Sequence, residues 1–177
     1  MAGLSLGDTA PPFELPATDG SKHEVGDTTG DRATLVYWTC NHCPYALAWH
    51  DRLIEVAREY GEQGVRFLAI NSNDAKKYPD DSPEAMKERV KTEGNWPHPY
   101  LHDDSQEIAK AYGAQKTPEL FLFDENMTLR YHGAPDADYE DPRQEAAWLR
   151  AAIDDLLGGR DVEMAESEPV GCTIKWK

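Results

Sequence analysis

The strongest constraint on the fold is a change of hydrophobic period between residues 33 and 60. Residues 33–39 read ATLVYWT, and this short β-branched and aromatic run is typical of a strand buried on both faces, as in a parallel sheet. Beyond residue 43 the period becomes helical, and apolar side chains share one helix face at Trp49, Leu53, Val56 and Tyr60. A buried strand that leads directly into a helix predicts an α/β fold.

The rest of the chain repeats this alternation. The pattern predicts further strands at residues 65–70, 119–124 and 128–133, and further helices at 83–93, at about 105–112 and from Asp141-Pro142 to Gly158. Early strands that are joined by helical crossovers should pair in parallel, whereas the short link ENM predicts an antiparallel hairpin for the last two strands. The predicted sheet is therefore mixed.

The length of 177 residues predicts a single domain over residues 1–177. Residues 1–32 are rich in Pro, Gly, Asp and Thr and contain two short extended pieces, which predicts a hairpin-like N-terminal extension. Residues 159–177 show no clear period and form a predicted C-terminal tail. This tail is expected to fold back on the domain, with Ile174 and Trp176 as apolar anchors.

Charge and cysteine content narrow the functional classes. Asp and Glu number 33 against 18 Lys and Arg, and the formal net charge of -15 disfavours nucleic acid and anionic membranes as partners. Such a surface fits either a high-salt environment or an ordinary acidic protein. The chain shows no signal-peptide pattern and no apolar run of membrane-spanning length, so we expect a cytoplasmic protein. In a reducing cytoplasm, a close cysteine pair indicates catalysis or metal binding rather than a structural disulfide.

Cys40 and Cys43 form a C-x-x-C pair between the predicted strand and the predicted helix. A helix N-terminus stabilises a thiolate, so the pKa of the first cysteine is expected to fall below its free value of ~8.5. We expect Cys40 to be exposed and to attack a disulfide, and Cys43 to resolve the mixed disulfide. His42, between them, is expected to lower the pKa of Cys40 further and to favour the reduced form.

Two less specific interpretations of the cysteine pair remain. A structural zinc site normally needs a second pair or two closely spaced histidines, and His98 and His102 have no second C-x-x-C near them. We therefore predict no metal and no other cofactor. The two cysteines could also be inert core thiols, since free cysteine is commonly buried.

A second motif, KTPELFLFD, places Thr117-Pro118 directly before a strand, where a proline can open the strand without breaking it. Together with GDTAPPFELPATDG and WTCNHCPY, this stretch resembles the thioredoxin-like superfamily, in the redoxin branch with AhpC/TSA- and TlpA-related members. The stretches NSNDAKKYPDD, LRYHG and GCTIKWK are similar to a subfamily described as thioredoxin-like or thiol-disulfide oxidoreductase. The resemblance covers about residues 5–158.

The resemblance implies an α/β thioredoxin-like fold, with a central mixed β-sheet flanked by helices on both faces. It also implies a thiol-disulfide oxidoreductase in which Cys40 is the nucleophile and Cys43 the resolving thiol. The Thr117–Pro118 bond is expected to be cis, with Thr117 offering its backbone to an extended substrate. Expected partners are protein or low-molecular-weight disulfides and a thiol electron donor, and the expected state is a monomer or weak homodimer.

Aromatic residues beside the motif, Trp38 and Tyr45, are predicted to shape a small apolar docking surface, although a core position is equally compatible with them. Thioredoxin itself carries Trp directly before the first cysteine, Gly-Pro between the two, and a buried acid in the preceding strand. This chain has Asn41-His42 between its cysteines, and residues 33–39 contain no acid. Its redox potential therefore cannot be transferred from thioredoxin.

Two alternative functions stay open. A peroxiredoxin-like thiol peroxidase is the first, although the motif P-x-x-x-T-x-x-C is absent before Cys40 and before Cys43. The second is a non-catalytic thioredoxin-like binding module, which the cysteine pair disfavours. Cys172, in GCTIKWK, is either a third redox thiol that exchanges with the pair or a tail thiol without a partner.

Overall fold

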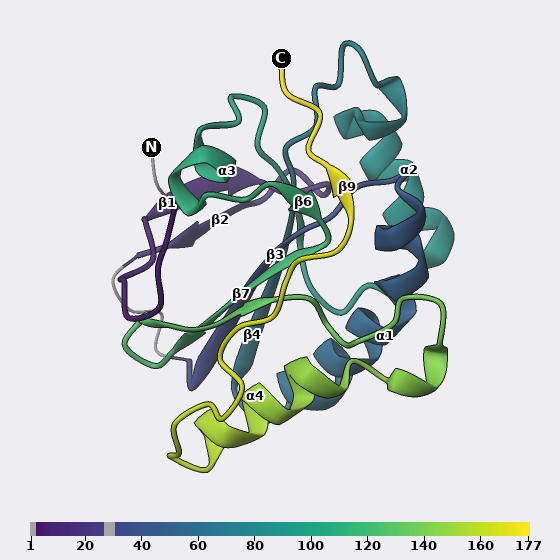
Figure 1. Cartoon of the computed structure of the whole chain (residues 1–177). Coiled ribbons are helices and arrows are strands. Elements are labelled where there is room, and N and C mark those ends of the chain that lie inside the picture. The colour runs from purple at the N-terminus through teal and green to yellow at the C-terminus, as the bar shows by residue number, and fades with distance from the viewer. Residues whose placement is uncertain (1–2, 27–30) are drawn as a thin grey trace.

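The computed structural model (Figure 1) describes residues 3–26 and 31–177 of the chain. Residues 1–2 and 27–30 of the predicted N-terminal extension lie outside the described residues. The strands are β1 (Phe13–Pro16), β2 (Lys22–Val25), β3 (Ala33–Trp38), β4 (Val65–Asn71), β5 (Tyr100–His102), β6 (Lys116–Thr117), β7 (Glu119–Asp124), β8 (Leu129–Gly133) and β9 (Cys172–Thr173). The helices are α1 (Pro44–Gly61), α2 (Pro83–Glu93), α3 (Glu107–Tyr112) and α4 (Ala147–Leu157), with short 3₁₀ turns η1 (Pro79–Asp81) and η2 (Pro142–Gln144).

A five-stranded mixed sheet forms the centre of the molecule, in the order β5-β4-β3-β7-β8. Strands β5, β4 and β3 pair in parallel, and β7 pairs antiparallel with both β3 and β8. The predicted mixed sheet and the predicted late hairpin are thus confirmed. All six residues of β3 are buried, as expected for a strand in the middle of a sheet covered on both faces.

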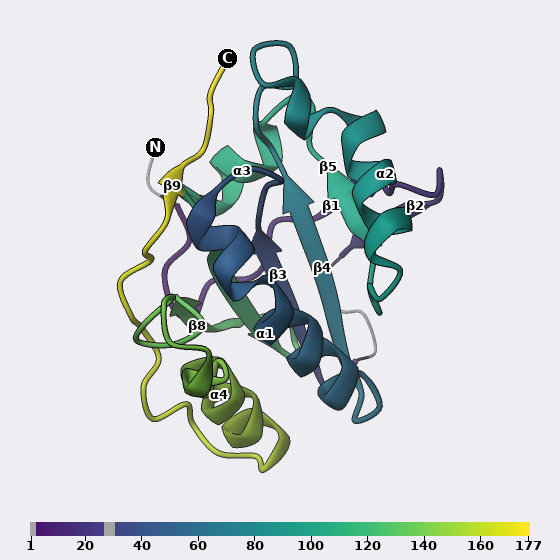
Figure 2. The ribbon, with the colours of Figure 1, turned by 90° about the vertical axis from the view of Figure 1, so that its right-hand side faces the viewer.

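Helices cover both faces of this sheet, as the resemblance implies (Figure 2). On one face, alternate residues of β3 such as Leu35 and Tyr37 pack with α1 and α4. On the other face, Val36 and Trp38 pack with α3, the N-terminal hairpin and the end of the chain. The two apolar layers hold β3 and α1 rigidly, so the loop between them has fixed ends.

The N-terminal extension forms the predicted hairpin in its described part. Strands β1 and β2 pair antiparallel, from Phe13 opposite Val25 to Pro16 opposite Lys22. Phe13 and Val25 are buried against the α3 side of the sheet. Among the described residues, no helix has the length and apolar character needed to cross a membrane.

Helix boundaries follow the sequence signals with one exception. The N-cap Ser82 accepts a hydrogen bond from the backbone N–H of Ala85, and α2 ends at Gly94 with a left-handed φ of 65°. The helix predicted to start at Asp141-Pro142 is wrong at its N-terminus, because η2 is followed by a left-handed Ala146 before α4 begins. The Ala146 N–H donates to the buried Asp136 carboxylate at 2.9 Å, a bond that draws the chain out of helical geometry there.

The C-terminal tail folds back across the molecule, in yellow in Figure 1. It adds β9 to β6 as a separate antiparallel pair, and the N–H of Ile174 donates to the carbonyl of Gln115 at 2.9 Å. Ile174 is fully buried and Trp176 is partly buried against the α3 side of the core. The predicted apolar anchors of the tail are therefore confirmed.

Candidate active site

The two cysteines of the C-x-x-C pair lie in the loop between β3 and α1, and Cys43 is the N-cap of α1. Both side chains are buried, with 1% of Cys40 and 0% of Cys43 exposed. The prediction that Cys40 is exposed is therefore wrong. The reason is that residues from distant segments close over the loop, with Thr117 at Cys40 and Cys172 packed against the pair.

Thr117 contacts all three cysteines of the chain. The Sγ atom of Cys40 lies 3.5 Å from Thr117 Oγ1, and the Sγ atom of Cys43 lies 3.2 Å from the Thr117 carbonyl oxygen, to which its protonated form can donate. The Thr117 hydroxyl in turn donates to the carbonyl of Cys172 at 3.4 Å. The bond between Thr117 and Pro118 is cis, as the resemblance implies. The pair of motifs singled out in the sequence therefore meets in one site.

The thiolate of this site belongs to Cys43. A hydrogen bond from Cys40 is the largest effect on Cys43 and, with further hydrogen bonds from Cys172 and the Ala46 N–H, it lowers the pKa of Cys43 to about 4. The same Cys40–Cys43 hydrogen bond, followed by burial, raises the pKa of Cys40, and the negative charge of Asp81 adds to this rise. The predicted low pKa of Cys40 is thus corrected, since the proton of the pair stays on Cys40.

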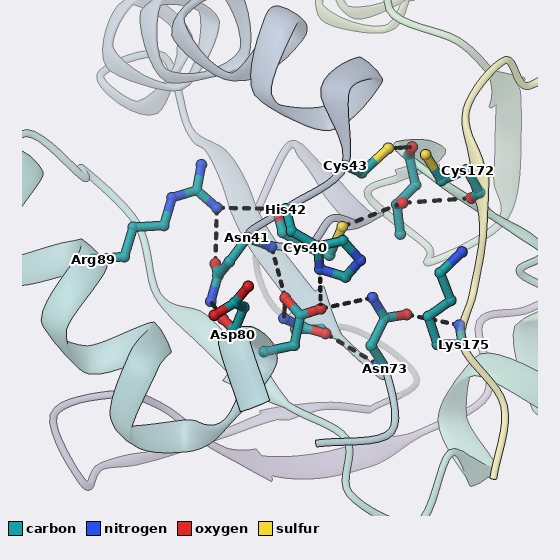
Figure 3. A network of polar contacts seen from close by, with 12 residues as sticks. Cys40, Asn41, His42, Cys43, Asn73, Asp80, Arg89, Cys172 and Lys175 are labelled. Atoms are coloured by element: carbon teal, nitrogen blue, oxygen red, sulfur yellow. Dashed lines mark hydrogen bonds and ion pairs between the residues drawn. The ribbon is translucent and has the colours of Figure 1, made fainter. Parts of the chain in front are cut away.

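His42 faces an acid that the sequence analysis did not identify. Its Nδ1 atom lies 2.6 Å from Oδ2 of Asp81, a contact drawn as a dashed line from His42 in Figure 3. The His42 ring stacks on Tyr78 with the ring centres 5.7 Å apart. The backbone N–H of His42 lowers the pKa of Cys40, but less than the effects of Cys43, burial, Thr117 and Asp81 change it. A pKa-tuning role for the imidazole stays a prediction.

Asp81 is fully buried beside the cysteine loop. Its Oδ1 accepts from the backbone N–H of Asn41 at 2.7 Å and from the Asn71 side chain at 3.1 Å, while Oδ2 accepts from the Asn73 side chain at 3.0 Å. A buried acid therefore does accompany the pair, but it comes from η1 and not from β3. It fixes the loop through Asn41 and places a negative charge near Cys40.

The ligand atoms of Cys40, His42 and Asp81 lie within 4.8 Å of one another, a grouping that can hold a metal ion. A structural zinc site takes four ligands. Both oxygens of Asp81 already accept hydrogen bonds from protein N–H groups, and a metal would have to displace some of them. The absence of a metal stays a prediction.

Arg89 of α2 forms hydrogen bonds with the loop between β3 and α1 that contains the cysteines. Its Nη1 atom donates to the Cys40 carbonyl at 3.1 Å and to Oδ1 of Asn41 at 2.9 Å. The guanidinium lies over the ring of Trp96, with its central carbon 5.3 Å from the ring centre. Arg89 thus ties the backbone of the cysteine loop to a neighbouring helix.

Glu119 supports the cis-proline turn from the following strand. It is 2% exposed, and its Oε1 accepts from the backbone N–H groups of Gln115 and Lys116 at 2.8 and 3.0 Å. Its Oε2 lies 2.6 Å from Nε2 of His132. These contacts hold the segment that presents Thr117 to the cysteines.

The two aromatic residues predicted to form a docking surface differ in position. Trp38 is fully buried and its indole N–H donates to Ser72 at 2.9 Å, so its predicted place on a docking surface is wrong. Trp38 is in the core because β3 turns this side chain toward α3. Tyr45 is partly buried beside the cysteines, with its ring centre 4.4 Å from that of Tyr139.

Comparison with known proteins places this geometry in a family. The model of the AhpC/TSA family matches residues 6–132, which include the cysteine pair and the cis-proline. The chain belongs to the AhpC/TSA family.

Relatives of this AhpC/TSA family member support a redox function. The thiol-disulfide oxidoreductase ResA of Geobacillus thermodenitrificans is 27% identical over 129 residues, which are 72% of this chain and 68% of ResA. The crystal structure of an uncharacterized conserved protein from Geobacillus kaustophilus is 42% identical, with a TM-score of 0.90 over 98% of this chain and 93% of that chain. The thioredoxin domain of a thiol-disulfide oxidoreductase from Bacteroides vulgatus is 16% identical, with a TM-score of 0.62 over 75% of this chain and 90% of that chain, and shows the shared thioredoxin-like fold.

Sequence reasoning missed Asp81 and Arg89 as site residues. Both follow β4, the parallel neighbour of the strand that carries the cysteines. The signal available was positional, because polar residues after the carboxyl ends of adjacent parallel strands gather at one edge of the sheet. The segment NSNDAKKYPDD carries part of the family resemblance, but its sequence does not indicate that one of its acids is buried.

Proposed function

We propose that this protein is a thiol-disulfide oxidoreductase whose redox group is the Cys40–Cys43 dithiol. Its substrates are protein or low-molecular-weight disulfides, and a thiol donor returns the pair to the reduced state. The observation that carries this proposal is that both sulfurs meet at Thr117, directly before the cis-proline, at 3.5 and 3.2 Å from its side-chain and carbonyl oxygens. The hydrogen bond from Cys40 adds to this by lowering the pKa of Cys43 to about 4. Two sulfur atoms in hydrogen-bond contact, one of them a thiolate at neutral pH, are prepared for disulfide exchange.

The proposed cycle needs no group from outside the protein except the disulfide substrate and the thiol donor. Cys40 first passes its proton to the hydrogen-bonded Cys43 thiolate, and its own thiolate then attacks the substrate disulfide and forms a mixed disulfide. The first substrate sulfur leaves and takes the proton back from Cys43, so it departs as a thiol. The Cys43 thiolate then attacks Cys40 Sγ, forms the Cys40–Cys43 disulfide and releases the second substrate sulfur. Burial of Cys40 means that the loop must open, or a surface thiol must intervene, before a large substrate can reach it.

Thr117 and Pro118 shape the site in this proposal. The Thr117 hydroxyl lies 3.5 Å from the Cys40 sulfur, and the Thr117 carbonyl oxygen lies 3.2 Å from the Cys43 sulfur, so one residue contacts both sulfurs. The partly buried Tyr45 adds an apolar surface beside the pair. The backbone edge of Thr117 is already paired with Cys172, so an extended substrate must displace the tail to use that edge.

Turnover of a small aromatic disulfide and of insulin, with dithiothreitol as donor, tests the proposal. Wild-type protein should accelerate both reactions, and Cys40→Ser and Cys43→Ser should each return the rate to that of the donor alone. If Cys40 attacks first, Cys43→Ser should accumulate a mixed disulfide at Cys40. Equal rates for wild-type protein and for the variant that lacks both cysteines would contradict the proposal.

A thiol peroxidase is the second candidate, favoured by the AhpC/TSA family match. Hydrogen peroxide consumption by the same wild-type and variant proteins separates the two functions. We expect disulfide reduction to be the faster reaction, because no threonine lies three positions before either cysteine of the pair. Faster peroxide consumption would favour the peroxidase, and neither activity would favour a binding module.

A further inference from the structure

The C-terminal tail contains the third cysteine of the chain, Cys172, and this residue packs against the proposed redox pair. Cys172 lies opposite Thr117 in the antiparallel pairing of β9 with β6. Further along the tail, the N–H of Lys175 donates to Asn73 at 2.9 Å and its carbonyl accepts from Gln106 at 3.0 Å. The pairing with Thr117 at Cys172 and the hydrogen bonds at Lys175 hold the backbone of the tail in place, and they thereby position Cys172.

The sulfur of Cys172 contacts one member of the pair. A hydrogen bond joins the side chains of Cys172 and Cys43. Cys172 also packs against the small buried cluster formed by Cys40, Cys43 and Ala46. Figure 3 shows the Cys172 side chain beside Cys43 at the edge of the cluster. The geometry therefore selects Cys43 as the sulfur with which Cys172 can exchange.

Exposure separates Cys172 from the other two thiols. Cys40 and Cys43 are inaccessible to solvent, whereas Cys172 is partly exposed. A thiol donor from solution can therefore reach Cys172 without opening the cysteine loop.

We propose that Cys172 is a third catalytic thiol, which moves the disulfide from the buried Cys40–Cys43 pair to the surface for reduction by an external thiol. This inference rests on the proposed oxidoreductase function and assigns the route by which electrons enter the site. In this route the electron donor is a thiol in solution, and it attacks the accessible sulfur of Cys172.

The exchange is balanced in sulfur, protons and electrons. The Cys172 thiolate attacks Cys43 Sγ, the Cys43–Cys172 bond forms, and the Cys40–Cys43 bond breaks. Cys40 leaves as a thiolate and takes up the proton that Cys172 lost, so this step involves no net oxidation. The external thiolate then attacks Cys172 Sγ, the bond between Cys172 and the donor forms, the Cys43–Cys172 bond breaks, and Cys43 leaves as a thiolate. A second donor thiol attacks the donor sulfur of this mixed disulfide and releases Cys172 as a thiol, so that two donor thiols supply the two electrons and leave joined as a disulfide.

The electrostatics of the three sulfurs favour this direction. Burial first, and then the hydrogen bond and negative charge of Cys43, raise the pKa of Cys172 to about 11 in the reduced protein. The effects of Cys43 vanish when Cys43 is in a disulfide, while Lys175 and Lys116 continue to lower the pKa of Cys172. When the donor attacks Cys172, Cys43 is the leaving group, and a thiol of low pKa leaves faster.

Disulfide mapping of the wild-type chain tests this inference. The reduced protein is treated with one equivalent of oxidised glutathione, quenched with acid, alkylated with N-ethylmaleimide and digested with trypsin. Cleavage after Arg32, Arg52, Arg160 and Lys175 gives peptide 33–52, with both cysteines of the pair, and peptide 161–175, with Cys172. We expect a linked pair of these two peptides in which Cys40 carries the alkyl group.

The outcomes for the two proposals differ. A disulfide confined to peptide 33–52, with Cys172 alkylated in every sample, overturns the role of Cys172 and leaves the oxidoreductase function intact. No disulfide among the three cysteines, together with no turnover, overturns the proposed function itself. The same mapping of Cys40→Ser and Cys43→Ser is the matched control. Cys40→Ser should still form the Cys43–Cys172 link, and Cys43→Ser should lose it; equal linking in both variants contradicts the assigned exchange.

Discussion

Cys172 lies opposite Thr117 in an antiparallel pair, and Thr117 in turn contacts both sulfurs of the C-x-x-C motif. One residue before a cis-proline thus joins three cysteines from two distant parts of the chain. The C-terminal tail closes the site that the central sheet and α1 build. This relationship makes the tail part of the redox centre, and it leads to the following expectations.

Acid titration of the reduced protein should show one thiolate at unusually low pH. Because the pKa of Cys43 is lowered to about 4, its thiolate persists above that pH and is lost as the pH falls through about 4. The thiolate ultraviolet absorbance measures this directly. Cys40→Ala should raise the Cys43 pKa, since the hydrogen bond from Cys40 is the largest lowering effect, and Cys172→Ala should raise it less. A wild-type thiolate that titrates near the free value of ~8.5 contradicts this account.

Asp81→Asn should loosen the cysteine loop. An amide cannot accept hydrogen bonds at both positions where the carboxylate accepts from Asn41 and Asn73, so one buried donor loses its partner. We expect the free energy of unfolding to fall by about 1–3 kcal/mol and disulfide turnover to fall with it. Chemical denaturation measures the first effect. Asp80→Asn is the matched control, because Asp80 is an exposed neighbouring acid. Equal losses in both variants argue against a special role for Asp81.

Arg89→Lys should affect the site although it keeps the charge. Lysine lacks the planar fork with which Arg89 reaches the Cys40 carbonyl and the Asn41 side chain at once. We expect a loss of about 1–2 kcal/mol of stability and slower disulfide reduction. Lys87→Ala, an exposed change on the same helix, is the control and should leave turnover unchanged. Wild-type turnover in Arg89→Lys would remove Arg89 from the support of the cysteine loop.

Gly171→Ala should displace the tail from the site. A Cβ atom at this position would stand 2.2 Å from the carbonyl oxygen of Thr117, so β9 and β6 cannot stay paired without movement. We expect faster alkylation of Cys172 and a loss of about 1–3 kcal/mol of stability. Gly61→Ala, where nothing lies within 4 Å of the added carbon, is the control. Identical alkylation rates in both variants contradict the close fit of the tail.

The fold and part of the site could be predicted from local sequence signals. The apolar run of β3, the helical period of α1 and the Ser82 cap reflect short-range preferences that the tertiary structure leaves unchanged. The cis bond at Thr117–Pro118 followed from family resemblance. The strand, the helix and the cap depend on residues close together in the sequence, and the cis-proline belongs to a recognisable motif. Both kinds of signal are visible in a single sequence.

Long-range features of the site could not be predicted in the same way. The exposure of Cys40 and the location of the thiolate depend on which segments fold over the loop, and Asp81 and Cys172 come from distant positions. For Trp38 the sequence left a docking surface and a core position equally open, and the contacts with α3 and Ser72 decide for the core. Burial and charge at a site are sums over such contacts, so the sequence pattern alone leaves them undetermined.

The reduction potential of the Cys40–Cys43 pair, measured in glutathione buffers with the redox state read by alkylation and mass, tests the central claim most directly. We predict a reversible two-electron transition that requires both cysteines. Because the Cys43 thiolate stabilises the reduced form, its midpoint should lie above the value of about -270 mV for thioredoxin. A pair that stays fully reduced at every glutathione ratio, or a transition that persists in Cys40→Ser and Cys43→Ser alike, would contradict the account.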